Sequence, residues 1–173
     1  MRKVLKTLVI IIFFGLLSFI VTGIFKKIKE NRLSEEKITT LPHFSLPDLN
    51  GGIFNTSEIK NGPVLLVRFH PECGHCSYEL NEIFKSGLTA RGVMVLLVTV
   101  APQNDVKAFL AQFDAGEDEN VVSMTDTAYV LSDIFRKNVI PSNYIYNKEL
   151  KLVKALYGEY KIETILKYLE PGE

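Results

Sequence analysis

The sequence contains no tryptophan, only two cysteines and only three histidines, none of which follows His75. Two cysteines are too few for a domain held together by several disulfides. The formal net charge is zero, but residues 1–32 carry seven basic residues and one acidic residue, while residues 33–173 carry 13 basic and 19 acidic residues. The second region lacks the basic excess that binding to a phosphate backbone requires, so we expect no nucleic-acid partner.

An uncharged, apolar run extends from Thr7 to Phe25 between basic flanks. Nineteen helical residues rise about 28 Å, close to the roughly 30 Å hydrocarbon core of a bilayer. A cleaved signal peptide is the alternative, but its apolar stretch is usually shorter and ends in an A-x-A site, and no clear site of that kind follows here. We therefore predict a single N-terminal transmembrane helix. Residues 1–32 would form the anchor with its basic flanks, 33–41 a polar stalk and 42–173 one folded domain.

The hydrophobic pattern of the domain predicts an α/β fold. Two short, almost continuous apolar runs, 63–69 and 93–100, are typical of strands buried on both faces of a sheet. We expect helices over 76–85, 104–113 with Asn104 as N-cap, 127–135 and 160–169, strands over 143–146 and 151–156, and a turn at 147–149. Because a helix separates the first two strands, we expect them to be parallel and joined by a right-handed crossover.

A C-x-x-C motif, from Cys73 to Cys76, follows directly from the first predicted strand and begins a helix. Free N–H groups and the helix dipole stabilise a thiolate at a helix N-terminus, and the second cysteine lies within reach of a disulfide. Gly74 would keep the turn uncrowded, and a protonated His75 would favour a neighbouring thiolate. A structural disulfide around two intervening residues would remove little chain entropy. The motif therefore predicts redox chemistry, with metal binding by the same cysteines as the alternative.

Three segments carry motifs that occur together in one known group of proteins. Residues 43–51 (HFSLPDLNG) are similar to an F-x-L-x-D-x-x-G strand and turn, residues 64–76 to an active-site strand with its C-x-x-C, and residues 139–145 (VIPSNYI) to a V-x-P-T-x-F-I segment. In this order they resemble the membrane-anchored thiol–disulfide oxidoreductases of the TlpA/ResA type. The resemblance covers about residues 41–169. It implies a thioredoxin-like fold, in which helices flank a central mixed sheet.

The resemblance also implies a role for each matching residue. Cys73 would be the thiolate that attacks a protein partner and forms a mixed disulfide with it, and Cys76 would resolve that mixed disulfide. Pro141 would follow a cis peptide bond and lie beside the cysteines. There the backbone of Ile140 would pair with an extended partner segment and would keep metal ions off the thiols.

Two glutamates near the cysteines are predicted to influence them in different ways. Glu79 lies three residues after Cys76, near the apolar face of its helix, where an unpaired carboxylate would be costly. The resembled group has a glutamate here that is linked to proton transfer, so Glu79 would help deprotonate Cys76. The alternative is a glutamate at the edge of the helix that reaches solvent. Glu72 stands where the group usually has tryptophan, and its carboxylate should disfavour the Cys73 thiolate, opposing His75.

A soft-metal site is the main alternative use of the same residues. His70 and His75 could join the two cysteines in binding Cu(I) or Zn, and copper chaperones of the SCO type resemble this fold. Those proteins need a distant histidine, however, and none follows His75. His70 also stands where a peroxiredoxin-type peroxidase needs Thr or Ser. We therefore expect no metal and no cofactor besides a redox-active Cys73–Cys76 disulfide.

Taken together, the residues and the resemblance predict a single-pass protein of the cell membrane with its domain outside the cytoplasm, in a periplasm or on the outer surface. Its thioredoxin-like domain would exchange disulfides with protein thiols and disulfides. A membrane-bound or soluble protein would be its redox partner. A reductant role in cytochrome c maturation or in envelope disulfide control is the specific expectation. The alternative function is a carrier of copper or another soft metal.

Overall fold

The computed structural model describes residues 15–23, 36–113 and 118–169. The chain divides into two units, Met1–Lys37 and Ile38–Glu173. In the first unit, residues 15–23 are helical and their side chains are exposed. Within the described ranges, no helix is both long enough and apolar enough to cross a bilayer. Residues 7–14 and 24–25 of the predicted transmembrane helix lie outside the described residues.

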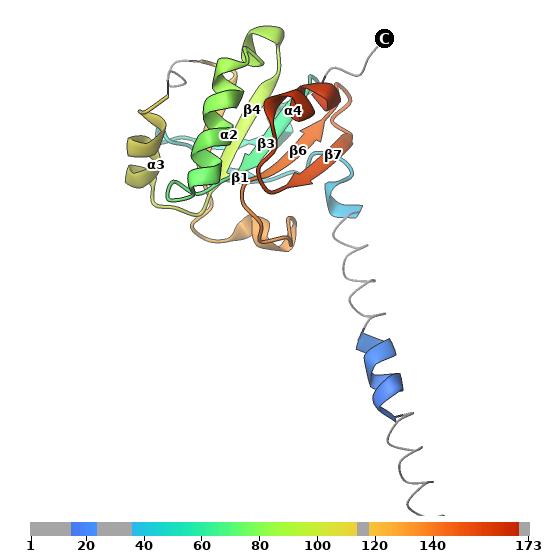
Figure 1. The fold of residues 1–173 in the computed structure, drawn as a ribbon. Helices are drawn as coiled ribbons and strands as arrows, with labels where there is room; N and C mark the ends of the chain where they lie inside the picture. Colours follow the sequence, from blue (N-terminus) through green and yellow to red (C-terminus); the bar gives the residue numbers. More distant parts are fainter. Residues whose placement is uncertain (1–14, 24–35, 114–117, 170–173) are drawn as a thin grey trace, which may run out of the picture. The chain divides into compact units, whose positions relative to one another are not determined.

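The second unit is built on a five-stranded mixed sheet with β3 at its centre (Figure 1). In spatial order the strands are β5 (Val121–Thr125), β4 (Met94–Thr99), β3 (Val64–Arg68), β6 (Ser142–Tyr146) and β7 (Leu152–Tyr157). β4 runs parallel to β3 and β5 runs parallel to β4, whereas β6 is antiparallel to both β3 and β7. The predicted parallel pair and C-terminal hairpin are therefore confirmed.

Each face of the sheet has its own hydrophobic core, because successive side chains of β3 point in opposite directions. Leu65 and Val67 pack on one face with the apolar sides of three helices. These helices are α2 (Gly74–Lys85), α3 (Gln103–Leu110) and α4 (Ile162–Leu169). Val64 and Leu66 pack on the other face with residues from the N-terminal hairpin and from the β5–β6 connection. Since all four of these β3 side chains are fully buried, the continuous apolar run is explained by a central strand covered on both sides.

The second face is covered by short elements. They are the hairpin of β1 (Ser45–Pro47) and β2 (Ile53–Asn55), and the 3₁₀ helices η1 (Thr56–Glu58) and η3 (Val130–Asp133); a further 3₁₀ turn, η2 (Thr89–Arg91), precedes β4. Residues 38–41, the C-terminal end of the predicted stalk, also belong to this unit. Ile38 and Leu41 are buried in the second core, and Thr40 forms a β-bridge with Lys151.

Two of the expected helices differ from those in the structure. The expected helix over 127–135 is wrong, because only η3 forms there. Tyr129 has a left-handed backbone, with φ 56°, which interrupts a continuous helix. The buried carboxylate of Asp126 instead accepts hydrogen bonds from the N–H groups of Val130 and Leu131, at 2.7 and 2.9 Å.

The helix expected over 104–113 is also displaced. α3 begins at Gln103, so Asn104 lies inside it and Pro102 occupies the N-cap position. Proline suits this position because it lacks the N–H that a helix start leaves unsatisfied. β5, which follows the acidic loop, was not expected from the sequence. It is a short strand at the edge of the sheet, and only its last two residues are buried.

Candidate active site

The C-x-x-C motif lies where a buried strand ends and a helix begins. Cys73 is the N-cap of α2, with an extended backbone, and its Sγ accepts a hydrogen bond from the Cys76 N–H at 3.3 Å. Both cysteines are free thiols in the structure, Cys73 half-buried and Cys76 fully buried. Only Cys73 is therefore accessible to a partner, while Cys76 faces the core.

Burial raises the pKa of the Cys76 thiol well above its ordinary value of 9.0. The nearby Cys73 thiol and the charge of Glu79 raise it further, while a backbone hydrogen bond from His70 opposes them. A thiol in this environment keeps its proton at neutral pH, so it becomes a nucleophile only when a base removes that proton. The arrangement separates an accessible thiol from one whose reaction requires proton transfer.

Glu79 is a buried carboxylate whose charge acts on the Cys76 thiol. It lies on α2 one turn after Cys76, and only 1% of its surface is exposed. Its Oε1 accepts a hydrogen bond from Asn143 Nδ2 at 2.8 Å, and its Oε2 accepts one from the Tyr160 N–H at 2.7 Å. Burial raises the pKa of the Glu79 carboxyl above its ordinary value of 4.5, although both hydrogen bonds favour the ionised form. The solvent-exposed alternative for Glu79 is therefore wrong.

Pro141 lies at the same edge of the sheet as the cysteine motif. The Ile140–Pro141 peptide bond is cis, as the resemblance implied. The pairing of Arg68 with Ser142 places the residue before β6 opposite the residue that follows β3. Ile140 is 40% exposed, and no hydrogen bond to its backbone is found within the described part of the chain. Ile140 is thus an exposed residue at the end of the sheet where the chain leaves β3 toward the cysteine motif.

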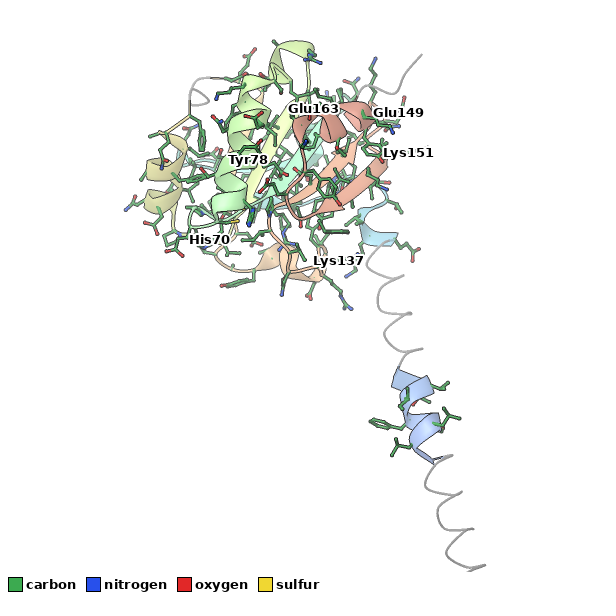
Figure 2. All side chains as sticks on the ribbon, viewed as in Figure 1. His70, Tyr78, Lys137, Glu149, Lys151 and Glu163 are labelled. Atoms are coloured by element: carbon green, nitrogen blue, oxygen red, sulfur yellow. The ribbon has the colours of Figure 1, made fainter. Side chains whose placement is uncertain are left out.

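The residues that flank the cysteines have specific partners. His75, the second residue of α2, places its Nδ1 2.5 Å from Oε2 of Glu159, which follows β7. Glu72 is almost fully exposed, and its Oε2 lies 4.0 Å from Nδ1 of His70. His70 lies at the end of the domain where α2 begins (Figure 2). Steric crowding does not require glycine at position 74, because a Cβ there would meet no atom within 4 Å.

No group of three or more His, Cys, Asp or Glu side chains that could hold a metal ion is found in ranges 15–23, 36–113 and 118–169. The site does contain three contributors that the sequence did not reveal: Asn143, Glu159 and the backbone of Tyr160. Asn143 gives a weak signal, because it is a polar residue within the apolar strand β6. Glu159 and Tyr160 give none, because they become neighbours of α2 only through the sheet topology.

The central sheet, the helices and a C-x-x-C pair at the start of α2 define a thioredoxin-like thiol–disulfide oxidoreductase. Comparison with known proteins agrees with this class. The chain belongs to the AhpC/TSA family, which matches residues 39–158. It is similar to the thiol-disulfide oxidoreductase ResA of Bacillus subtilis (strain 168), with 28% identity over 141 residues, covering 76% of this chain and 75% of ResA.

Solved structures show the same fold. A secreted disulfide oxidoreductase of Mycobacterium tuberculosis, homologous to E. coli DsbE, matches with a TM-score of 0.64 and 13% identity, covering 77% of this chain and 96% of its own. An exposed lipoprotein thioredoxin of Streptococcus pneumoniae strain TIGR4 matches with a TM-score of 0.61 and 23% identity, covering 74% and 98%. The expected thioredoxin-like fold with a mixed central sheet is therefore confirmed.

Proposed function

We propose that this protein exchanges disulfides with other proteins through Cys73 and Cys76, outside the cytoplasm and next to a membrane. The observation that carries the proposal is the asymmetry of the two thiols. One is accessible at the N-terminus of α2, and the other is buried beside a carboxylate. A structural pair of cysteines would need neither the exposed sulfur nor the buried base.

In the reductive direction, the Cys73 thiolate attacks a disulfide of the partner. A mixed disulfide forms, and one partner sulfur leaves as a thiolate. Cys76 then loses its proton to Glu79 and attacks Sγ of Cys73. The Cys73–Cys76 disulfide forms and the second partner sulfur leaves as a thiolate, which takes up a proton. The partner disulfide is reduced and the cysteine pair is oxidised by the same two electrons, and the reverse sequence oxidises a partner dithiol.

A protein substrate fits the surroundings of Cys73 better than a small thiol does. Four large hydrophobic residues of the β5–β6 connection are 40–62% exposed: Tyr129, Val130, Val139 and Ile140. This connection lies at the same end of the sheet as the turn into α2 (Figure 1). We infer that an extended partner segment pairs with the Ile140 backbone and packs its side chains on these residues.

The anchor and the location are part of the same proposal. The apolar run 7–25 has the length of a transmembrane helix, and disulfide exchange is most useful where disulfides persist. The solved relatives described as secreted and as an exposed lipoprotein are consistent with this placement. We propose that residues 1–32 anchor the protein, that 33–41 link the anchor to the domain, and that 42–173 act as a reductant in cytochrome c maturation or in envelope disulfide control.

Trapping in cells tests the redox proposal. Cys76→Ala should accumulate mixed disulfides through Cys73, visible as adducts that dithiothreitol dissolves on a non-reducing gel. Cys73→Ala is the matched control and should trap none. Two results together would refute thiol exchange. Cys76→Ala would trap no adducts, and the wild-type Cys73–Cys76 pair would show no measurable equilibrium redox potential.

Alkaline phosphatase fused to the C-terminus tests the location. It should be active outside the cytoplasm. Activity of a reporter that works only in the cytoplasm would contradict this part of the proposal.

A further inference from the structure

Three consecutive residues after β7 contact three different parts of the candidate site. This segment, 158–160, contacts in order the carbonyl of Pro141, the ring of His75 and the carboxylate of Glu79, at 2.9, 2.5 and 2.7 Å. The first and third contacts are made by backbone N–H groups, and the second by the Glu159 side chain. The segment therefore joins the proline before β6, the exposed turn of the C-x-x-C motif and the buried carboxylate.

The backbone conformation of the segment depends on glycine. Gly158 has φ +98°, a region that L side chains rarely adopt. A Cβ at this position would meet no atom within 4 Å, so the requirement is conformational and not steric. The turn at Gly158 directs the next two residues toward α2, and Tyr160 then reaches Glu79 with its backbone.

The His75–Glu159 contact lies at the surface, since the side chain of His75 is 77% exposed and that of Glu159 is 35% exposed. Surface ion pairs contribute little to global stability. The consequence of this pair is therefore local. Its position matters because the adjacent residue, Tyr160, donates one of the two hydrogen bonds that hold the buried carboxylate.

We propose that the His75–Glu159 pair is a clasp that holds the 158–160 segment on α2 and so keeps the Tyr160 N–H on Glu79. The inference rests on the proposed role of Glu79 as the proton acceptor for Cys76. His75 is then a positioning residue, which acts on the buried carboxylate through the backbone. In the structure its polar contact is with Glu159, while Cys73 Sγ takes its hydrogen bond from the Cys76 N–H.

The direction of the effect follows from the groups that act on Glu79. The hydrogen bonds from Asn143 and Tyr160 lower the pKa of the Glu79 carboxyl, and the charge of Glu159 raises it. Replacing His75 by alanine removes its contact with Glu159 and should release the segment that carries the Tyr160 N–H. Loss of the Tyr160 hydrogen bond should raise the pKa of the Glu79 carboxyl.

Nuclear magnetic resonance of the reduced full-length protein tests the clasp. His75→Ala should speed amide exchange at Tyr160 by roughly tenfold, since local opening governs that rate, and should shift the Glu79 carboxyl titration to higher pH. His75→Lys places a hydrogen-bond donor opposite Glu159 again and should restore both values. Glu163→Gln, an exposed carboxylate on α4 (Figure 2), is the matched control and should change neither.

Three outcomes would overturn the clasp. One is an unchanged Tyr160 exchange rate in His75→Ala. The second is a shifted Glu79 titration with unchanged exchange, which would mean that His75 acts by charge alone. The third combines two variants. His75→Lys fails to restore the protection of the Tyr160 amide from exchange, and Glu159→Ala leaves that amide protected. These readouts need no turnover, so a wild-type protein that fails to exchange disulfides would refute the proposed function separately.

Discussion

Replacing Glu79 by glutamine should make the protein more stable at high pH. The carboxylate is buried and has two donors, and the Oδ1 atom of Asn143 beside it is buried without a hydrogen-bond partner among the described residues. A glutamine oxygen can accept from the Tyr160 N–H. Its NH₂ group can donate to Asn143 Oδ1 once the Asn143 amide is turned over. The substitution therefore removes a buried charge and retains a hydrogen bond to each neighbour.

The pH dependence follows from the raised pKa of Glu79. Below its ordinary value of 4.5, the carboxyl is protonated in both the folded and the unfolded chain, and a protonated Glu79 resembles glutamine. As the pH rises, the unfolded chain releases its proton first, so the free energy of unfolding falls until the folded carboxyl titrates. The loss is about 1.4 kcal/mol for each unit by which the two pKa values differ. The unpaired Asn143 Oδ1 adds to the cost in the wild-type protein, because a buried polar oxygen without a partner costs about 1–3 kcal/mol.

Urea unfolding of the reduced full-length protein measures this effect. We expect Glu79→Gln and wild type to differ by less than about 0.5 kcal/mol at pH 4, and the variant to be at least about 1 kcal/mol more stable at pH 8. Glu163→Gln should show no such change. A stability difference that is the same at both pH values would refute the buried, proton-accepting carboxylate. Glutamine cannot accept a proton, so the variant should also accumulate mixed disulfides.

Three further results are expected. At pH 8, iodoacetamide should modify Cys73 and leave Cys76 unmodified in the folded reduced protein, because burial raises the pKa of Cys76; equal labelling by mass spectrometry would contradict this. Leu80→Ala removes a fully buried side chain of α2 and should lower the free energy of unfolding by about 2–5 kcal/mol, and a loss below 1 kcal/mol would argue against its place in the core. Gly158→Ala should cost about 1–2 kcal/mol and speed amide exchange at Tyr160, whereas unchanged exchange would separate the turn from the site.

The elements with strong hydrophobic patterns were predictable from the sequence. The run 63–69 contains β3, and the run 93–100 contains β4, because strands buried on both faces are almost continuously apolar. The predictions of secondary structure fail where local backbone geometry outweighs amino-acid composition. The left-handed backbone at Tyr129 and the Asp126 hydrogen bonds replace an expected helix by a 3₁₀ turn, and no periodicity in the sequence reveals either.

The candidate site likewise has a part that the sequence predicted and a part that it did not. The cysteines and Glu79 lie on one helix, so their spacing predicted their proximity. Asn143 and Tyr160 reach Glu79 from positions 64 and 81 residues away, through the antiparallel insertion of β6 beside β3 and through the turn at Gly158. Contacts that depend on strand order leave no local pattern in a single sequence, and for this reason the environment of the carboxylate could not be predicted.

The location of the two Glu79 donors has a consequence for biosynthesis. The reactive pair lies in the first half of the chain, but both hydrogen bonds to the adjacent carboxylate come from residues 143 and 160. During synthesis the cysteines emerge long before the groups that hold this carboxylate. A chain interrupted between Cys76 and Asn143 would carry the C-x-x-C motif without the hydrogen bonds to the Glu79 carboxylate. The complete set of hydrogen bonds to Glu79 therefore requires a chain that extends through Tyr160.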